Sequence, residues 1–269
     1  LTESIGVTEM ILDEVMAAAG IEHFGVAAYE DTLPGTGFKK RELFDGMDSV
    51  IVCLIPWDTG MNEGRNVARF AVGRNYHDVA AEHLAVATEI LRRAFPENTF
   101  KFFVDSSPIA EVRAANLAGL GIRGRNNLLI SKAYGTRCAI GEIVTDRRFT
   151  RSKKMPGSCF ECGLCTEHCP NGALTENGFV REKCVSYINQ MKKELTPEDK
   201  ALIKKVGFVC GCDCCTDICP MNRRFDGTGW REFKDSARPV YHPGDDLSDR
   251  SYGWKAENVE RNYKIITEE

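Results

Sequence analysis

The chain has 269 residues, of which 43% are hydrophobic and 28% charged, and its formal net charge is −4. This length allows a sizeable core in one large or two smaller domains. No apolar run approaches the roughly 20 residues of a transmembrane helix, no secretory signal is visible, and the net charge indicates no general affinity for nucleic acid. We therefore expect a cytoplasmic protein.

Helices and strands alternate along the first part of the chain. Helical periodicity and stop signals predict helices at residues 8–20, 76–95 and 109–121. Short runs of apolar and β-branched residues predict strands at residues 23–30, 48–56, 99–108, 126–131 and 138–146. This order predicts a layered α/β or α+β domain over residues 1–152.

The composition changes near residue 153. Ten of the twelve cysteines lie between Cys159 and Cys219, which indicates a separate metal-binding module over residues 153–225. A helical stretch is predicted within it at residues 181–195. The remaining residues, 226–269, form a polar tail with one late helix.

The first cysteine run has a specific spacing. Cys159, Cys162, Cys165 and Cys169, followed by Pro170, form the C-x2-C-x2-C-x3-C-P run of bacterial ferredoxins. In that run the first three thiolates bind one 4Fe–4S cluster and the fourth binds another. Zinc knuckles do not suit this spacing, so we expect two 4Fe–4S clusters.

The second run is one ligand short. Counting back from Cys219 gives Cys215, Cys212 and then Val209 where a cysteine belongs. Two clusters need eight thiolates, so the eighth comes from Cys184, Cys210 or Cys214. Cys210 and Cys214 are displaced by one residue from the template, so we expect them to point away from the cluster. The remaining two, Cys53 and Cys138, lie in apolar strands and are expected in the core.

Two other features stand out. Asp105 follows a predicted strand, a common place for a functional carboxylate, although such residues are often only turn or cap residues. Basic clusters occur at residues 146–154, 192–193, 204–205 and 223–224. These can contact phosphates, but on composition alone they indicate solvated surfaces.

Several segments occur in an order that resembles the epoxyqueuosine reductase family. They are "RFAVGRNYH", "VDSSPIAE", "AGLGIRGRNNLLI", "GEIVTD", the first cysteine run, "KCVSYI" and "GCDCCTDICPMN". The resemblance implies an α+β fold: a layered mixed-sheet cobalamin-binding domain, similar to reductive dehalogenases and nitroreductases, joined to a ferredoxin-like module with two 4Fe–4S clusters. It also implies reduction of epoxyqueuosine to queuosine in tRNA, with cobalamin as cofactor and a low-potential electron donor of the flavodoxin or ferredoxin type.

The same resemblance implies roles for individual residues. Asp105 is the expected proton donor, with a pKa raised by burial beside the corrin. Cys184 is the expected eighth ligand. One cluster would be held by Cys159, Cys162, Cys165 and Cys219, and the other by Cys169, Cys184, Cys212 and Cys215. The expected cobalamin contacts are Tyr76, Asp105, Gly124, Arg125, Asn126, Leu129, Ser186, Gly211 and Cys212.

The chain also departs from the family pattern. Asn75 replaces an aspartate, Ile122 a bulkier residue, Arg125 a lysine, Cys210 a tyrosine and Thr216 a glutamine. The tail is not a helical repeat, so we expect a short form without the family's C-terminal repeat domain, which weakens the tRNA prediction. Two alternatives therefore remain: a cobalamin-dependent reductase of a different small substrate, and a non-catalytic electron-transfer protein.

Overall fold

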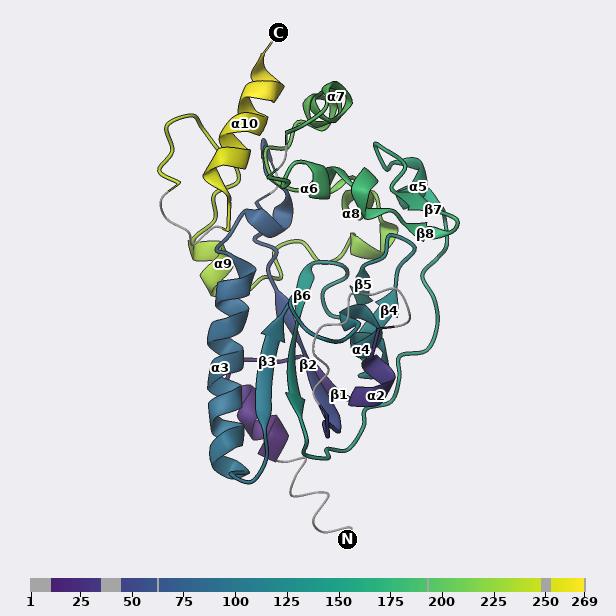
Figure 1. The fold of residues 1–269 in the computed structure, drawn as a ribbon, viewed down its shortest axis with the longest axis vertical. Coiled ribbons are helices and arrows are strands. Elements are labelled where there is room, and N and C mark those ends of the chain that lie inside the picture. The colour runs from purple at the N-terminus through teal and green to yellow at the C-terminus, as the bar shows by residue number, and fades with distance from the viewer. Residues whose placement is uncertain (1–10, 35–44, 62, 193, 248–252, 269) are drawn as a thin grey trace.

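A four-stranded antiparallel sheet is the centre of the first half of the chain (Figure 1). The computed structural model describes residues 11–34, 45–61, 63–192, 194–247 and 253–268. The strands are β1 (Phe24–Ala28), β2 (Ser49–Pro56), β3 (Phe100–Val104) and β6 (Cys138–Thr145), in the order β1-β2-β6-β3. Every neighbouring pair is antiparallel. β2 is buried along its whole length, as its continuous apolar sequence predicts.

Helices cover both faces of this sheet, which confirms the layered α+β prediction. On one face, α3 (Tyr76–Ala94) and the helical residues 11–18 pack against Ile51 and Cys53. On the other face, α4 (Glu111–Leu117) packs against Val50 and Val52. The same side carries α2 (Tyr29–Thr32) and the hairpin of β4 (Gly121–Arg123) and β5 (Leu129–Ser131). Successive residues of β2 thus point to opposite layers. The part of the predicted helix at residues 8–10 lies outside the described residues.

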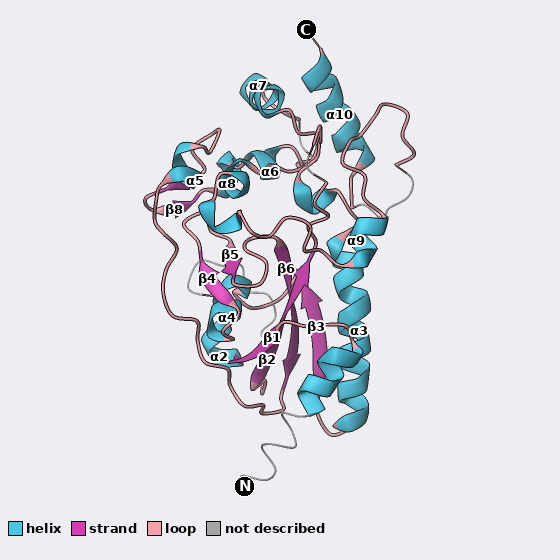
Figure 2. Ribbon diagram, turned by 180° about the vertical axis from the view of Figure 1, so that it is seen from behind, coloured by secondary structure: helices cyan, strands magenta, loops and turns pink. Residues whose placement is uncertain are grey.

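The cysteine-rich segment consists of short elements, seen from behind in Figure 2. They are α5 (Leu164–Glu167), β7 (Leu174–Thr175), β8 (Gly178–Phe179), η2 (Arg181–Lys183), α6 (Val185–Ile188), α7 (Pro197–Val206), α8 (Cys214–Asp217) and η3 (Pro220–Asn222). A further short helix, η1 (Arg69–Ala71), precedes α3.

The helix predicted at residues 181–195 is wrong in its position. Within the described residues of that range, the helical elements are η2 and α6, and the longer helix of this segment is α7. The Thr196 side chain accepts a hydrogen bond from the Asp199 backbone, the Asp199 side chain accepts one from Thr196, and Pro197 occupies the first turn. This capping box starts a helix at residue 197.

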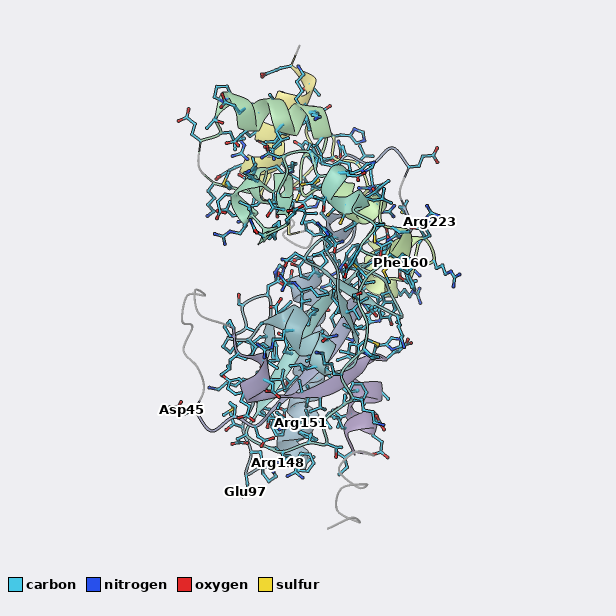
Figure 3. All side chains as sticks on the ribbon, turned by 90° about the vertical axis from the view of Figure 1, so that its right-hand side faces the viewer. Asp45, Glu97, Arg148, Arg151, Phe160 and Arg223 are labelled. Carbon is cyan, nitrogen blue, oxygen red and sulfur yellow. The ribbon has the colours of Figure 1, made fainter. Side chains whose placement is uncertain are left out.

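The tail packs back onto both preceding segments. It contains α9 (Arg231–Asp235) and the predicted late helix, α10 (Ala256–Thr267). Phe233 is fully buried in the core beside α3, and the Asn262 amide donates to the carbonyls of Asn189 and Val209. Figure 3 shows α10 and the cysteine-rich segment together above the sheet. Of the described helices, none is long and apolar enough to cross a membrane.

Candidate functional site

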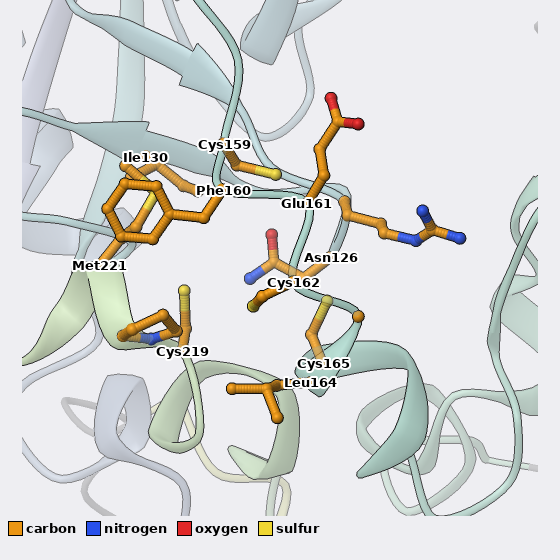
Figure 4. Close-up of a pocket in the computed structure, with 13 residues that line it drawn as sticks. Asn126, Ile130, Cys159, Phe160, Glu161, Cys162, Leu164, Cys165, Cys219 and Met221 are labelled. Atoms are coloured by element: carbon orange, nitrogen blue, oxygen red, sulfur yellow. The ribbon is translucent and has the colours of Figure 1, made fainter.

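Four cysteines from two segments line one small cavity (Figure 4). Cys159, Cys162 and Cys165 belong to the first run, and Cys219 ends the second. The Cys219 thiol lies in the electrostatic field of the other three. The structure thus brings together the four residues predicted to hold the first cluster, with Phe160 and Met221 along one side of the space.

The other four predicted ligands line a second, larger cavity of about 470 Å³ between the sheet and the cysteine-rich segment. These are Cys169, Cys184, Cys212 and Cys215. The pKa of the Cys215 thiol is raised to about 12, mainly by burial and also by the nearby thiols of Cys184 and Cys169. Cys184 therefore lies in the same cavity as the other three predicted ligands, although it is outside both runs.

The two groups of thiols suit clusters better than single ions. In the described ranges of the chain, no group of three or more His, Cys, Asp or Glu side chains is placed to hold one metal ion. A zinc ion needs its ligands at about 2.3 Å from one centre. In a 4Fe–4S cluster each thiolate binds a different iron, so the thiols surround a wider space.

The remaining cysteines divide between core and cavity. Cys53 is buried in the core, as predicted, and Cys210 is buried among Val67, Tyr241 and Trp254. Cys138 and Cys214, in contrast, line the larger cavity. The expectation that Cys214 points away from the second cluster stays a prediction; its thiol is hydrogen-bonded to that of Cys212.

Asp105 lies in the turn after β3 and also lines the larger cavity. Its backbone is left-handed, with φ of 57°, a conformation that aspartate tolerates better than most residues. The Tyr76 hydroxyl donates a hydrogen bond to Oδ2 of Asp105, and Nε2 of His77 lies 2.8 Å from the same oxygen. Both partners come from the first turn of α3, so this contact joins α3 to the end of β3.

These contacts reverse the expected shift of the Asp105 pKa. Burial raises it, but the hydrogen bonds from His77 and Tyr76 outweigh burial and hold it below its usual range. The hydrogen bond to Asp105 raises the pKa of His77. The expectation of a protonated Asp105 beside a bound corrin stays a prediction; the two pKa shifts, downward for Asp105 and upward for His77, favour the proton on His77.

Asn75 fixes the orientation of the His77 ring. Oδ1 of Asn75 caps α3 by accepting a hydrogen bond from the His77 backbone N–H. The same oxygen lies 2.9 Å from Nδ1 of the His77 ring. An acceptor at this position favours a proton on Nδ1, so the second proton of the imidazolium lies on Nε2, where it faces Asp105. His77 was not among the predicted site residues, although it directly follows the predicted contact Tyr76 in "RNYH".

Most of the predicted cobalamin contacts line the larger cavity. Those that do are Tyr76, Asp105, Asn126, Leu129, Ser186 and Cys212. Gly124 and Gly211 are absent from its lining, and Arg125 lines the first cluster cavity instead. Gly211 has φ of 77°, and a Cβ there would lie 2.4 Å from that of Ala68, so its role is to allow close packing.

The lining of this cavity fits a large, mainly apolar ligand with polar groups. It contains Phe70, Leu129 and Ile140, and Thr136 adds a hydroxyl. The side chain of Asn126 is buried, and its Nδ2 has no hydrogen-bond partner among the described residues. A buried amide donor without a partner is costly, so a ligand acceptor here would satisfy it.

Buried ion pairs hold the second cysteine run against the first domain. Arg65 contacts Asp213 and Asp217, each at 2.5 Å, and the Arg69 backbone N–H donates to Asp213 at 2.7 Å. Arg65 and Asp213 are almost fully buried. Because Asp213 lies between Cys212 and Cys214, these bonds position the loop that carries the predicted ligands.

The basic cluster at residues 146–154 is largely engaged within the protein. Arg148 and Arg151 bind Asp48, and the Arg147 guanidinium stacks on the Phe95 ring at 3.6 Å. Figure 3 shows Arg148 and Arg151 at the end of the molecule opposite the cysteine-rich segment. This supports a structural role for the three arginines.

Two family models match the chain. Residues 158–222 match the 4Fe-4S double cluster binding domain, which confirms the prediction of two clusters. Residues 38–106 match the family described as Epoxyqueuosine reductase QueG, DUF1730.

Curated relatives match about two thirds of the chain. An epoxyqueuosine reductase from Synechocystis sp. is 35% identical over 193 residues, which are 69% of this chain and 66% of the relative. One from Cyclobacterium marinum is 32% identical over 190 residues, which are 68% of this chain and 61% of the relative. The chain thus spans less than two thirds of the length of these relatives.

Solved structures share the fold over nearly the whole chain. A selenomethionine-labelled epoxyqueuosine reductase has a TM-score of 0.84 at 20% identity, covering 97% of this chain and 81% of that one. An epoxyqueuosine reductase with a tRNA-Tyr epoxyqueuosine-modified stem loop has a TM-score of 0.82 at 22% identity, with the same coverage. The catabolic reductive dehalogenase NpRdhA has a TM-score of 0.57 at 18% identity and covers 95% of this chain and 35% of that one. The expected similarity to reductive dehalogenases is thus confirmed at the level of fold.

Proposed function

The chain belongs to the epoxyqueuosine reductase family, and on that premise we propose that it is a cobalamin- and iron–sulfur-dependent reductase that converts epoxyqueuosine to queuosine in tRNA. The curated relatives bear this name, and one neighbour of the same fold was solved with an epoxyqueuosine-modified stem loop. In this proposal residues 1–152 are the catalytic domain, residues 153–225 the cluster domain and residues 226–269 a tail that braces both.

One observation carries the proposal. The same cavity is lined by Asp105 and by the thiols of Cys169, Cys184, Cys212 and Cys215. A source of protons and a source of electrons therefore face one space. Reduction of an epoxide to an alkene removes its oxygen as water and takes two electrons and two protons, so both sources are needed at one site.

The cofactors follow from the lining residues. We assign Cys159, Cys162, Cys165 and Cys219 to the first cluster and Cys169, Cys184, Cys212 and Cys215 to the second. Cobalamin would lie in the larger cavity against Tyr76, Asn126, Leu129 and Ser186, where it supplies a low-valent cobalt that reduces carbon centres.

The protein itself holds and moves the proton. Asp105 is ionised and accepts hydrogen bonds from the Tyr76 hydroxyl and from Nε2 of His77. As negative charge develops on the departing oxygen, one of the two protons passes from Nε2 of His77 to Oδ2 of Asp105 and from there to that oxygen, and the second comes from solvent. Asn75 keeps Nδ1 of His77 protonated, so that Nε2 faces Asp105.

An anaerobic turnover assay tests this function. The protein, loaded with both clusters and cobalamin, is given epoxyqueuosine-containing tRNA and dithionite, and queuosine is measured after nuclease digestion. We expect turnover that falls about 10²- to 10⁴-fold in Asp105→Asn, because the amide cannot transfer a proton. Asp235→Asn, a matched change at an exposed residue of α9, should keep the wild-type rate.

The outcomes separate the alternatives. Turnover of a free epoxide but not of tRNA would support a reductase of a small substrate. Failure to retain cobalamin, with both clusters intact, would support an electron-transfer protein. Equal rates for Asp105→Asn and the wild type would contradict the role of Asp105.

A further inference from the structure

A groove of about 570 Å³ lies directly beside the first cluster cavity. Its apolar lining includes Ile122, Met155, Phe160, Met221 and Phe225. Phe160 is 69% exposed, more than any other large hydrophobic side chain in the described ranges. An exposed aromatic beside an apolar groove is typical of a protein-binding surface.

This groove is in contact with the first cluster site. Ile130, Phe160, Pro220 and Met221 line both the groove and the cluster cavity. Phe160 directly follows Cys159, and Pro220 directly follows Cys219. Cys162 is itself exposed, whereas the second group of thiols lines the larger cavity with Asp105, which the proposed cobalamin would occupy. The first cluster is therefore the one that an external reductant can approach.

The groove is bordered by positive charge. Lys132, Arg223 and Arg224 line it and are exposed, and the exposed Lys153 and Lys154 immediately precede Met155. Among the residues that the structure describes, no carboxylate is ion-paired with Lys132, Arg223 or Arg224, unlike Arg148 and Arg151, which bind Asp48. Figure 3 shows Phe160 and Arg223 on the same edge of the molecule.

Two carboxylates near the first cluster limit the positive surface. Glu161 lines the cluster cavity, and Glu167 lies on α5, and both are exposed. Neither lines the groove, so the groove itself has only basic charged side chains.

We propose that this groove docks a small acidic one-electron carrier protein, with Phe160 and Met221 at the centre of the contact and Lys132, Arg223 and Arg224 around it. The inference rests on the proposed function in requiring that electrons enter at the first cluster. The position of the groove beside the first cluster favours a protein partner over RNA. An RNA substrate must reach Asp105 in the other cavity, whereas a reductant must reach the first cluster. The carrier loses one electron, the first cluster gains one, and no covalent bond changes.

Charge reversal at the groove tests the proposal. In cluster-loaded protein, Arg223→Glu/Arg224→Glu is compared with Lys200→Glu/Lys205→Glu, an equal charge change on the exposed face of α7. The probe is flavodoxin, an acidic flavoprotein. Binding of oxidised flavodoxin is measured by calorimetry, and reduction of the clusters by reduced flavodoxin is followed by stopped-flow absorbance at low and high salt.

We expect the groove variant to lose about tenfold or more in affinity and in the rate of cluster reduction at low salt, and the control to lose neither. High salt should bring the wild type close to the variant. Phe160→Ala should weaken binding at both salt concentrations, because the apolar contact is not screened. Iron content and reduction by dithionite should be equal in the wild type and in the two charge-reversal variants.

Equal binding and equal reduction rates in the groove variant and the wild type would overturn the proposal. A groove variant that lost affinity for a tRNA stem loop but kept its flavodoxin kinetics would overturn it in favour of RNA. Turnover driven by dithionite tests the proposed function independently, because it does not require the carrier. If turnover with dithionite failed while reduced flavodoxin still reduced the clusters at the normal rate, only the proposed function would be contradicted.

Discussion

Nε2 of His77 lies 2.8 Å from Oδ2 of Asp105, and Oδ1 of Asn75 lies 2.9 Å from Nδ1 of the same imidazole. The ring is thus held between an amide oxygen and a carboxylate. This arrangement makes the proton on Nε2, and not a proton on Asp105, the one available in the resting protein. Three predictions concern this site and the cysteines beside it, and a fourth concerns the buried ion pairs.

Replacement of His77 by glutamine should change the pH dependence of turnover. His77 has a raised pKa, so in the wild type the proton is retained at pH values above about 6.5, the pKa of an ordinary imidazole, and is lost as the pH rises further. In His77→Gln the side chain can still donate to Asp105 but cannot release a proton. We expect kcat to fall about tenfold or more and its alkaline limb to move to lower pH, since Asp105 must then hold the proton itself.

The control for this change is His242→Gln, in the exposed part of the tail. It should keep both kcat and the pH profile. A His77→Gln profile that matched the wild type would show that His77 only packs at this site.

Asn75→Asp should move the alkaline limb of the pH profile of kcat to higher pH. A carboxylate 2.9 Å from Nδ1 stabilises the imidazolium and raises the pKa of His77 further. Aspartate caps a helix as well as asparagine does, so the thermal stability of the protein should change little. The measurement is the pH profile of kcat together with the His77 titration by NMR. A limb that does not move, with His77 titrating as in the wild type, would contradict the orienting role of Asn75.

Cys184→Ser and Cys214→Ser separate a cluster ligand from a neighbouring thiol. Both residues line the larger cavity, but only Cys184 is assigned to the second cluster. Anaerobically reconstituted wild type should hold about eight iron atoms, from two 4Fe–4S clusters. Cys184→Ser should lose about half of this iron or show a changed electron paramagnetic resonance spectrum for one cluster, and Cys214→Ser should match the wild type. The reverse pattern would assign Cys214 as the ligand.

Arg65→Ala should destabilise the protein through Asp213. Removing the guanidinium leaves the buried carboxylate of Asp213 with Arg69 as its basic neighbour. Losing one member of a buried ion pair typically costs about 3–5 kcal/mol. Arg231→Ala breaks an exposed pair with Asp235 and should cost less than about 0.5 kcal/mol. Urea unfolding of the two variants measures the difference. Equal free energies of unfolding would contradict the structural role of Arg65.

Local sequence signals predicted those parts of the structure that local forces determine. β2 is a continuous apolar run and α3 an amphipathic run capped by Asn75, and both begin and end within one residue of the prediction. Counting the cysteines against a fixed template left three residues for the eighth ligand, and the family resemblance selected Cys184, which lies beside Cys169 and Cys215.

Features that depend on distant contacts were not predictable in the same way. The pKa of Asp105 is set by His77, which is adjacent to it only because α3 and β3 pack together. Phe233 has no local periodicity that indicates a core residue, yet it completes the core beside α3. Cys214 was placed outside the ligand set because it is displaced by one residue from the template, and the cavity that it lines depends on contacts with the first domain that are distant in the sequence.

The position of Phe233 and Asn262 has a consequence for the order of synthesis. Every predicted cluster ligand precedes residue 220, but the core beside α3 closes on Phe233, and Asn189 and Val209 obtain their hydrogen bonds from Asn262. While the ribosome still holds these later residues, the nascent cysteine loops lack part of their packing. We therefore expect stable insertion of both clusters to follow translation of the tail, and conditions that slow translation after Cys219 to leave the thiols exposed to oxygen for longer.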